Sequence, residues 1–270
     1  MSSADIAAEV LNAIDRAAPL APFSERGAGF DLAEAYRVTA ALHTQRLARG
    51  EHAVGRKIGF TNRTIWDDYK VFAPIWGYMY DTTLFELANT DRVDLARFAE
   101  PRIEPEIAFG LSRAPEAGMN EGQILECIDW AAHGFEIVQS HFPGWKFSAA
   151  DTVANGGLHG AYFIGDKVPV AGNRSAWLGA LSDFEIDLFC DGKHIDRGHA
   201  RNVLDGPLSA LKYFIELLAQ DPDNAPLAAG EIVTTGTVTK AFPVARGQRW
   251  HSAVHRLPLA AAELRFADRS

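Results

Sequence analysis

Two glutamates, Glu104 and Glu106, alternate with apolar residues in the run 102–109. In a β-strand, successive side chains point to opposite faces, so both carboxylates would share one face, roughly 7 Å apart. Glu136 is the only charged residue of the apolar run 134–138, where a charge without a partner is costly to bury. Three such carboxylates would suit Mg²⁺ or Mn²⁺, which prefer oxygen ligands and keep positions open for a chelating substrate. The ordinary alternative is a half-exposed strand with a solvated charged face.

A lysine, Lys57, lies between Gly55 and Gly59 in a strand-like run. Glycines at these positions allow another segment to approach the backbone closely. A lysine with apolar neighbours in a pocket would bind a carboxylate or donate a proton to a developing enolate. The alternative is an exposed lysine on an edge strand, where lysine commonly prevents aggregation.

Three further stretches are candidate substrate-binding segments. Ile75 and Trp76 belong to an aromatic-rich run with Pro74 and Gly77, which suits either a loop that lines an apolar pocket or aromatic packing in a core. The others are a glycine-rich loop with Gly156 and Gly157, which is otherwise a plain connection, and a β-branched run in which Gly236 and Thr237 would let backbone approach a ligand. His141 and His159 lack metal-ligand spacing, and neither is predicted to be a ligand.

The elements that must position these residues differ between the two ends of the chain. The periodicity predicts a helix over 5–17 and another from Asp31 to Gly50, which form an N-terminal helical subdomain over residues 1–52. The remainder, residues 53–270, is expected to be a sheet-rich catalytic domain.

Between the glutamates, a helix is predicted from Asn120 through Ala131, followed by a strand over 135–138 that carries Glu136. This strand-helix-strand order would bring the three glutamates together. Further on, Asp191-Gly192 indicates a hairpin turn and Pro207 a helix start.

The composition of the chain argues against some classes of function. A formal net charge of -9 argues against nucleic acid or an anionic membrane as partner. The start of the chain lacks a basic segment followed by an apolar one, and no run approaches about 18 consecutive apolar residues, so we expect a cytoplasmic protein. Cys127 and Cys190 show neither disulfide-framework nor zinc-site spacing.

Taken in order, these motifs resemble the hydratase/decarboxylase branch of the fumarylacetoacetate hydrolase superfamily, in which 2-keto-4-pentenoate hydratases and 4-oxalocrotonate decarboxylases are found. The resemblance runs from about Val54 to the C-terminus. Its segments are Gly-x-Lys-Ile-Gly-Phe-Thr at 55–61, Pro-x-aromatic-Gly at 74–77, Glu-x-Glu at 104–106, Glu-Ile-Val at 136–138, Trp-Lys at 145–146, Asp-Thr-Val-Ala at 151–154 and Thr-Gly-x-Val-Thr at 235–239.

The resemblance implies an α+β fold, a mixed β-roll with an N-terminal helical part, assembled as a homo-oligomer. It also implies that Glu104, Glu106 and Glu136 hold Mg²⁺ or Mn²⁺, which chelates a small 2-oxo acid substrate. Lys57 matches the family lysine and would act as a proton donor, acceptor or electrostatic partner at the C2 oxygen. Ile75, Trp76, Gly156, Gly157, Gly236 and Thr237 are the candidates for holding the rest of the substrate.

The expected activity is that of a metal-dependent lyase of aromatic-compound degradation. Hydration of a 2-hydroxy-2,4-dienoate to a 4-hydroxy-2-oxo acid comes first by family frequency. Decarboxylation of a 2-oxo-3-enedioate comes next, because hydratases often carry an acid where this chain has Ile75. A C–C bond hydrolase of an acylpyruvate and a non-catalytic carboxylate-binding protein are the remaining alternatives. Asn155, Gly156, Gln139 and His141 depart from the family pattern, which implies an altered substrate pocket.

Overall fold

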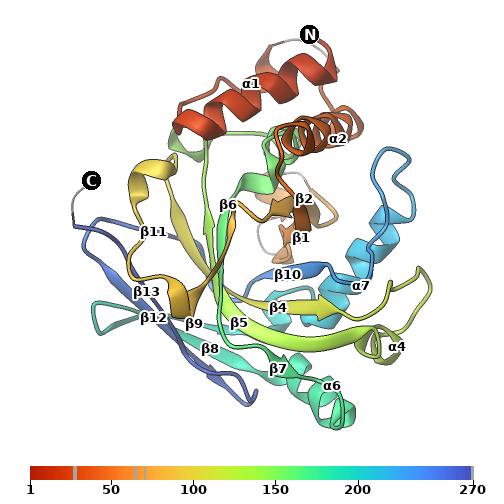
Figure 1. Cartoon of the computed structure of the whole chain (residues 1–270), viewed down its shortest axis with the longest axis vertical. Coiled ribbons are helices and arrows are strands. Elements are labelled where there is room, and N and C mark those ends of the chain that lie inside the picture. Colours follow the sequence, from red (N-terminus) through yellow and green to blue (C-terminus); the bar gives the residue numbers. More distant parts are fainter. Residues whose placement is uncertain (27–28, 64–65, 70, 269–270) are drawn as a thin grey trace.

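The computed structural model describes residues 1–26, 29–63, 66–69 and 71–268. It is an α+β fold in which a curled mixed sheet carries the site residues and helices cover its ends (Figure 1). The predicted fold class is therefore confirmed. Among the described residues, no helix is long and apolar enough to cross a membrane.

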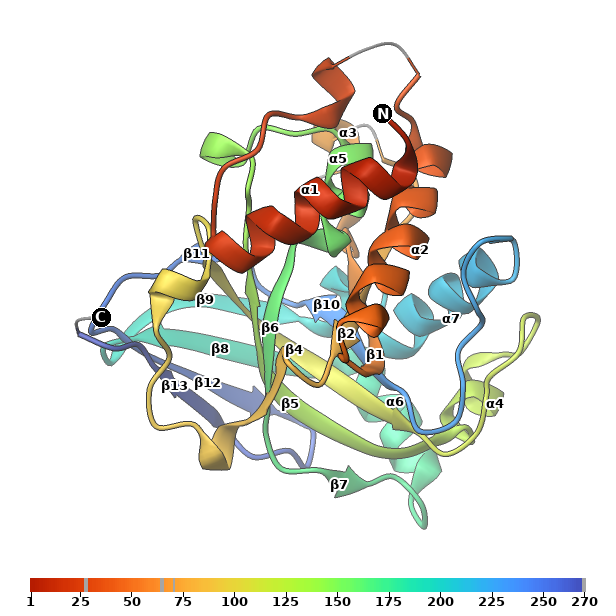
Figure 2. The same cartoon turned by 45° about the horizontal axis from the view of Figure 1, so that its top comes forward.

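Two helices open the chain, α1 (Ser3–Arg16) and α2 (Leu32–Ala48). The side chain of Ser2 caps α1, which begins two residues before the predicted start. That of Asp31 accepts from the Glu34 amide at the start of α2, as the sequence predicts. Figure 2 shows both helices beside α5 (Ala149–Ala154) at one end of the sheet. The division at residue 52 stays a prediction.

The N-terminal helices share a core with later parts of the chain. Val10 and Val38 belong to the same buried cluster as Phe142 and Val153. The Thr39 hydroxyl also donates to the Val153 carbonyl oxygen at 3.1 Å. Segments more than 100 residues apart in sequence therefore close one apolar interior.

The larger sheet contains nine strands among the described residues, in the order β2-β1-β10-β4-β5-β6-β3, with β11 paired to β4 and β7 to β5. Strand β1 is parallel to β10, and β3 is parallel to β6. The bounds are β1 Ala53–Gly59, β2 Ile75–Tyr80, β3 Leu84–Glu86, β4 Arg102–Leu111, β5 Ile128–Val138, β6 His159–Ile164, β7 Val168–Pro169, β10 Ile232–Thr237 and β11 Phe242–Pro243.

The smaller sheet has the order β13-β12-β8-β9, and the expected Asp191-Gly192 turn joins two of its strands. Its bounds are β8 Glu185–Cys190, β9 Lys193–His199, β12 Arg249–His255 and β13 Ala262–Arg265. The other α-helices are α3 Trp66–Tyr69, α4 Glu121–Leu125, α6 Arg174–Asp183 and α7 Pro207–Leu218. Short 3₁₀ helices lie at Phe23–Glu25, Leu87–Asn89, Leu95–Arg97, Pro143–Trp145, Gly156–Leu158 and Ala200–Asn202.

The helix predicted from Asn120 through Ala131 is wrong beyond its first turn. Helix α4 ends at Leu125, and Ile128 already begins β5, an 11-residue strand that pairs antiparallel with β4. Apolar residues that looked helical in spacing are instead buried between neighbouring strands, where tertiary pairing overrides a short periodic signal. The glutamates therefore lie on adjacent strands of one sheet.

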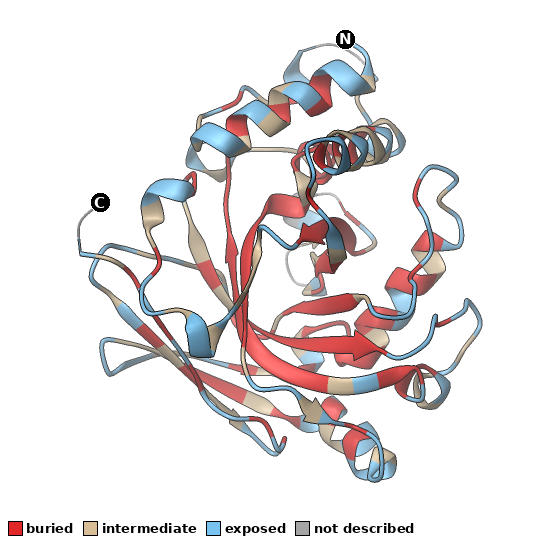
Figure 3. Ribbon diagram, in the orientation of Figure 1, coloured by how far each residue is buried: buried red, intermediate tan, exposed pale blue. Residues whose placement is uncertain are grey.

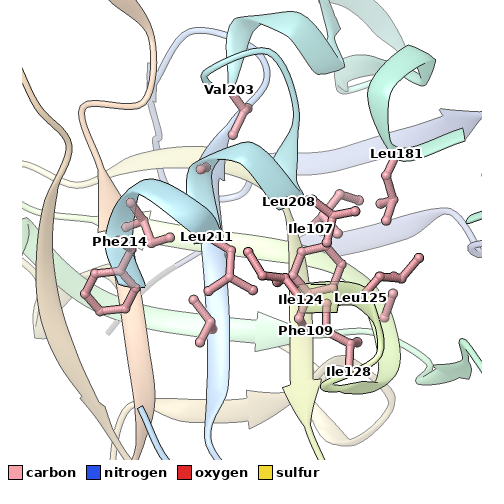
Figure 4. Close-up of a cluster of buried hydrophobic side chains, with 14 of the residues drawn as sticks. Ile107, Phe109, Ile124, Leu125, Ile128, Leu181, Val203, Leu208, Leu211 and Phe214 are labelled. Carbon is pink, nitrogen blue, oxygen red and sulfur yellow. The ribbon is translucent and has the colours of Figure 1, made fainter. Parts of the chain in front are cut away.

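The apolar face of β4 packs against helices. Ile107 and Phe109, both fully buried, contact a cluster that includes Leu211 and Phe214 of α7 (Figure 4). Most of β4 and β5 is buried on both faces (Figure 3). The alternation in the sequence thus identified the apolar face correctly, but the glutamate face is not a solvated one.

A buried histidine joins the two sheets and should make stability depend on pH. His133 of β5 donates from Nδ1 to the Ala260 carbonyl oxygen at 3.2 Å, and its Nε2 lies 3.0 Å from the Ser252 hydroxyl oxygen, which donates to it when the ring is neutral. Burial lowers the pKa of His133 to about 4, against about 6.5 in an unfolded chain.

Between pH 6.5 and 4 the unfolded state binds more protons at this position, so stability should fall as the pH falls. The loss attributable to His133 is about 3 kcal/mol and should be complete near pH 4. Urea unfolding at several pH values checks this, with His133→Gln as the comparison because glutamine does not titrate. An equal pH slope in both proteins would contradict the expectation.

Candidate active site

Three carboxylates meet on one face of the β4–β5 pair. Glu104 of β4 lies directly opposite Glu136 of β5, and Glu106 lies opposite Gly134. Each glutamate offers an oxygen within 4.8 Å of the other two. Glu106 and Glu136 are fully buried, whereas Glu104 is partly exposed. Direct strand pairing produces the cluster that the sequence predicted.

The electrostatics of this cluster fit a cation. Burial raises the pKa of Glu104 to about 7, with Glu136 adding to the shift. Burial and the two neighbouring carboxylates raise the pKa of Glu106 well above its usual range. Glu106 Oε1 is buried without a hydrogen-bond partner among the described residues, and Glu136 Oε2 has only the Lys57 ammonium beside it. Oxygen atoms left in this way match the donor set of Mg²⁺ or Mn²⁺.

Lys57 of β1 reaches the same cluster. Its Nζ lies 3.3 Å from Glu136 Oε2 as an ion pair and donates to the Gly157 carbonyl oxygen at 3.1 Å. Burial opposes its charge, but Glu136 and the other two glutamates raise the pKa of Lys57 above its usual value. A Cβ on Gly59 or Gly157 would come within 3.2 Å of the lysine side chain, so the glycines allow the close approach that the sequence indicated.

His159 is a site residue that sequence reasoning missed. Its Nδ1 lies 2.7 Å from Glu136 Oε1, and its Nε2 lies 3.0 Å from the Thr83 hydroxyl oxygen. Burial lowers the pKa of His159, so the neutral ring donates to Glu136 through Nδ1. The histidine and Lys57 occupy both oxygens of Glu136, whose pKa they hold below the usual range although burial acts to raise it. Its role follows from the β5–β6 register, which leaves no motif in the sequence.

Gly236 positions the third carboxylate. Its amide donates to Glu106 Oε2 at 3.0 Å, and Thr237 lies opposite Glu106 in the β10–β4 pair. The backbone of Gly236 has φ +93°, and a Cβ there would lie 2.1 Å from the Thr61 hydroxyl oxygen. A glycine is therefore required for both conformation and space.

A cavity of about 310 Å³ opens beside the cluster. Of the predicted residues, those that line it are Lys57, Glu104, Glu106, Ile75, Gly157, Gly236 and Thr237. Sequence reasoning missed the lining residues Thr61, Asn62, Arg102, Trp145, Phe147 and Lys240. Arg102 could have been predicted, because alternation along β4 places it on the same face as the glutamates. Nothing in the sequence indicated Lys240.

Two predicted substrate-binding residues lie outside this cavity. Strand alternation directs Trp76 away from its neighbour Ile75 and into the core, where its ring stacks on Tyr36 with centroids 5.5 Å apart. Gly156 lines a separate space of about 10 Å³ that His159 also borders. Substrate contact by Trp76 or Gly156 is therefore not supported by their positions.

No family model matches the chain. It is 27% identical over 239 residues to a 2-hydroxyhexa-2,4-dienoate hydratase of Comamonas testosteroni, covering 88% of each chain. It is 29% identical over 218 residues to a 4-oxalocrotonate decarboxylase of Pseudomonas sp. (strain CF600), covering 80% of this chain and 78% of that one.

Solved structures show the same fold. The 4-oxalocrotonate decarboxylase from Pseudomonas putida G7, complexed with magnesium and adipate, matches with a TM-score of 0.88 at 24% identity over 98% of this chain and 97% of that one. A fumarylpyruvate hydrolase from Pseudomonas aeruginosa, in complex with Mn²⁺ and pyruvate, matches with a TM-score of 0.54 at 15% identity over 78% of this chain and 88% of that one. In sequence and in fold, the chain is similar to members of the fumarylacetoacetate hydrolase superfamily.

The sequence matches are to enzymes of the hydratase/decarboxylase branch, the branch that the motifs resemble. The superfamily motifs converge on one place: Lys57 from β1, Glu104 and Glu106 from β4, Glu136 from β5 and Gly236 from β10. Widely separated segments thus build a single pocket.

Replacing Gly236 by alanine tests how tightly the pocket is built. The clash with Thr61 should displace the Gly236 amide from Glu106 and weaken Mn²⁺ binding. Gly230→Ala is the matched control, because Gly230 has φ +89° but nothing within 4 Å of an added Cβ. We expect Gly236→Ala to lower unfolding free energy by about 1–3 kcal/mol more than Gly230→Ala. Equal losses of unfolding free energy in the two variants, measured by chemical denaturation, would show that Thr61 moves aside without destabilising the fold.

Proposed function

We propose that this protein is a divalent-metal-dependent lyase of 2-oxo acids in aromatic-compound degradation, with Mg²⁺ or Mn²⁺ held by Glu104, Glu106 and Glu136. The observation that carries the proposal is the carboxylate cluster, whose oxygens lie within 4.8 Å of one another. Like charges at this distance and depth are unfavourable without a cation. The named activities of the relatives and the magnesium-bound neighbour support the same proposal.

When bound, the metal would chelate the carboxylate and C2 oxygen of the substrate and stabilise negative charge on that oxygen. The chain's own groups complete the site. Lys57, held by Glu136 and by the Gly157 carbonyl, is placed to donate a proton to the C2 oxygen. His159 keeps Glu136 in one orientation through its Nδ1–H group. Apolar lining residues exclude water from the reacting atoms.

Between the two reactions of the branch, the cavity favours decarboxylation. Ile75 is buried beside Lys57, at the place where an acid would be available to activate water. Among the described residues that line the cavity, Glu104 and Glu106 are the only carboxylates, and there is no histidine. Hydration, which came first on family frequency, needs a base for water, whereas decarboxylation needs only an electron sink.

For a 2-oxo-3-enedioate, the step balances without an added reactant. The C5–C6 bond breaks, and C6 leaves as CO₂. The electron pair of that bond forms the C4–C5 double bond, and the C3–C4 pair moves to C2–C3 so that charge develops on the C2 oxygen. A proton from Lys57 at this oxygen gives 2-hydroxypenta-2,4-dienoate.

Hydration remains the second candidate, because a hydratase relative matches 88% of the chain. Product analysis by NMR separates the two reactions. The purified protein is incubated with Mg²⁺ or Mn²⁺ and either 2-oxohex-3-enedioate or 2-hydroxypenta-2,4-dienoate. We expect CO₂ and a dienol from the first acid. A 4-hydroxy-2-oxo acid from the second would establish a hydratase instead, and no product from either acid would overturn the lyase proposal.

A further inference from the structure

We propose that Arg102 and Lys240 form a second carboxylate-binding subsite in the cavity, so that the protein prefers dicarboxylic to monocarboxylic 2-oxo acids. This inference rests on the proposed function, because it takes the first carboxylate of the substrate to lie at the glutamate cluster. Both cations line the same cavity as Glu104 and Glu106.

Arg102 is placed by the strand that carries two of the glutamates. Residues 102, 104 and 106 share one face of β4, and Arg102 is roughly 7 Å along the strand from Glu104. The Arg102 guanidinium lies over the Trp145 ring, 3.9 Å from its centroid. This stacking covers one face of the group and leaves its N–H edges for an acceptor. No ion pair or side-chain hydrogen bond of Arg102 is found in the described part of the chain.

Lys240 approaches from the other side of the same strand. Thr237 pairs with Glu106 and Phe242 with Ile103, so the segment between them runs alongside β4. The Lys240 amide donates to Asp196 Oδ2 at 3.2 Å, which anchors the backbone. Its ammonium has no carboxylate partner within the described ranges, although the residue borders the cavity. Arg102 and Lys240 thus line one cavity, and neither side chain makes a close ion pair with a described carboxylate.

The balance of charge in the cavity indicates a dianion. With a divalent cation bound, three ionised glutamates are neutralised by that cation together with the Lys57 ammonium. The charges of Arg102 and Lys240 remain, and they match the two carboxylates of a diacid. Arg102 is half-buried, so a monocarboxylate bound at the glutamate cluster would leave its charge without a counterion, which is unfavourable; Lys240 is more exposed and adds long-range attraction for the second carboxylate.

The length of a six-carbon diacid also fits. Three bonds of an extended chain span about 3.8 Å, so the five bonds between its two carboxyl carbons span about 6 Å. This is close to the rise of roughly 7 Å from position 104 to position 102. The far carboxylate leaves as CO₂, so its ion pairs are ground-state contacts and their loss should appear in KM more than in kcat.

Calorimetric titration of the magnesium-loaded protein tests the inference with two unreactive acids, adipate and hexanoate, which differ by one carboxylate. Wild type should bind adipate at least about tenfold more tightly than hexanoate. Arg102→Gln and Lys240→Gln should each remove most of this preference while leaving hexanoate affinity within about twofold. Lys193→Gln, an exposed lysine outside the cavity lining, should change neither affinity.

The second variant keeps the test valid if Arg102→Gln fails to fold without its contact to Trp145. Equal affinity of wild type for the two acids would overturn the subsite, as would an unchanged preference in Lys240→Gln. A clear adipate preference with no product from either NMR substrate would support the subsite and remove only the proposed reaction. With 2-oxohex-3-enedioate, Lys240→Gln should raise KM about tenfold and keep kcat within about twofold.

Discussion

Glu106→Gln is expected to abolish metal-dependent activity while leaving the fold intact. The glutamine amide keeps the size of the side chain but supplies one weak neutral oxygen where a carboxylate would bind Mg²⁺ or Mn²⁺. Glu106 is fully buried, and its Oε1 has no hydrogen-bond partner among the described residues, so this oxygen is free to bind the cation. We expect Mn²⁺ affinity to fall at least about 100-fold and kcat/KM at least about 1,000-fold.

Thermal unfolding of the metal-free protein provides the structural control. Burial and the neighbouring carboxylates raise the pKa of Glu106, so ionising it in the metal-free fold costs free energy. Glu106→Gln removes that cost, and the metal-free variant should unfold at the same or a higher temperature than wild type. Glu116→Gln, at an exposed position, should leave metal binding unchanged. Undiminished Mn²⁺ binding by Glu106→Gln would exclude the cluster as the metal site.

Lys57→Met should separate catalysis from metal binding. Methionine keeps the apolar stem and removes the ammonium that touches Glu136 and the Gly157 carbonyl oxygen. We expect kcat to fall about 100- to 10,000-fold because the proton donor at the C2 oxygen is lost. Mn²⁺ affinity should stay equal or increase, because a positive charge next to the cation has been removed.

Stopped-flow turnover measured beside Mn²⁺ titration checks this expectation. Lys193→Met, which alters an exposed lysine outside the cavity, should match wild type in both measurements. If Lys57→Met loses metal affinity as strongly as Glu106→Gln does, Lys57 has a structural role in the metal site. If its kcat is close to that of wild type, the lysine is not the proton donor.

The alternation of charged and apolar residues was enough to predict which face of β4 carries Glu104 and Glu106. It did not show that this face is buried, because burial depends on β5 and β10, which lie far away in sequence. The run after Asn120 shows the limit of short periodic patterns, since the helix ends at Leu125 and the strand begins at Ile128. Propensity is weak over such lengths, and strand pairing decides the outcome.

Strand register also explains why some site residues were not predicted from the sequence. A shift of one residue exchanges the two faces of a strand, so Ile75 borders the cavity while Trp76 lies in the core. The contact of His159 with Glu136 and the approach of Lys240 to β4 depend on pairings that no local motif encodes. The superfamily motifs located the three glutamates and Lys57, because these residues sit within short ordered runs.

The apolar interior shared by α1, α2 and α5 limits which segments can be exchanged between related proteins. Helix α5 leads directly into the segment whose Gly157 carbonyl oxygen holds Lys57. A chimera that joins residues 1–52 of one relative to the remainder of another would therefore pair α2 with a foreign Val153 surface. Successful exchange of the N-terminal helices requires the segment 142–154 to be exchanged with them, so recombination here needs three crossovers.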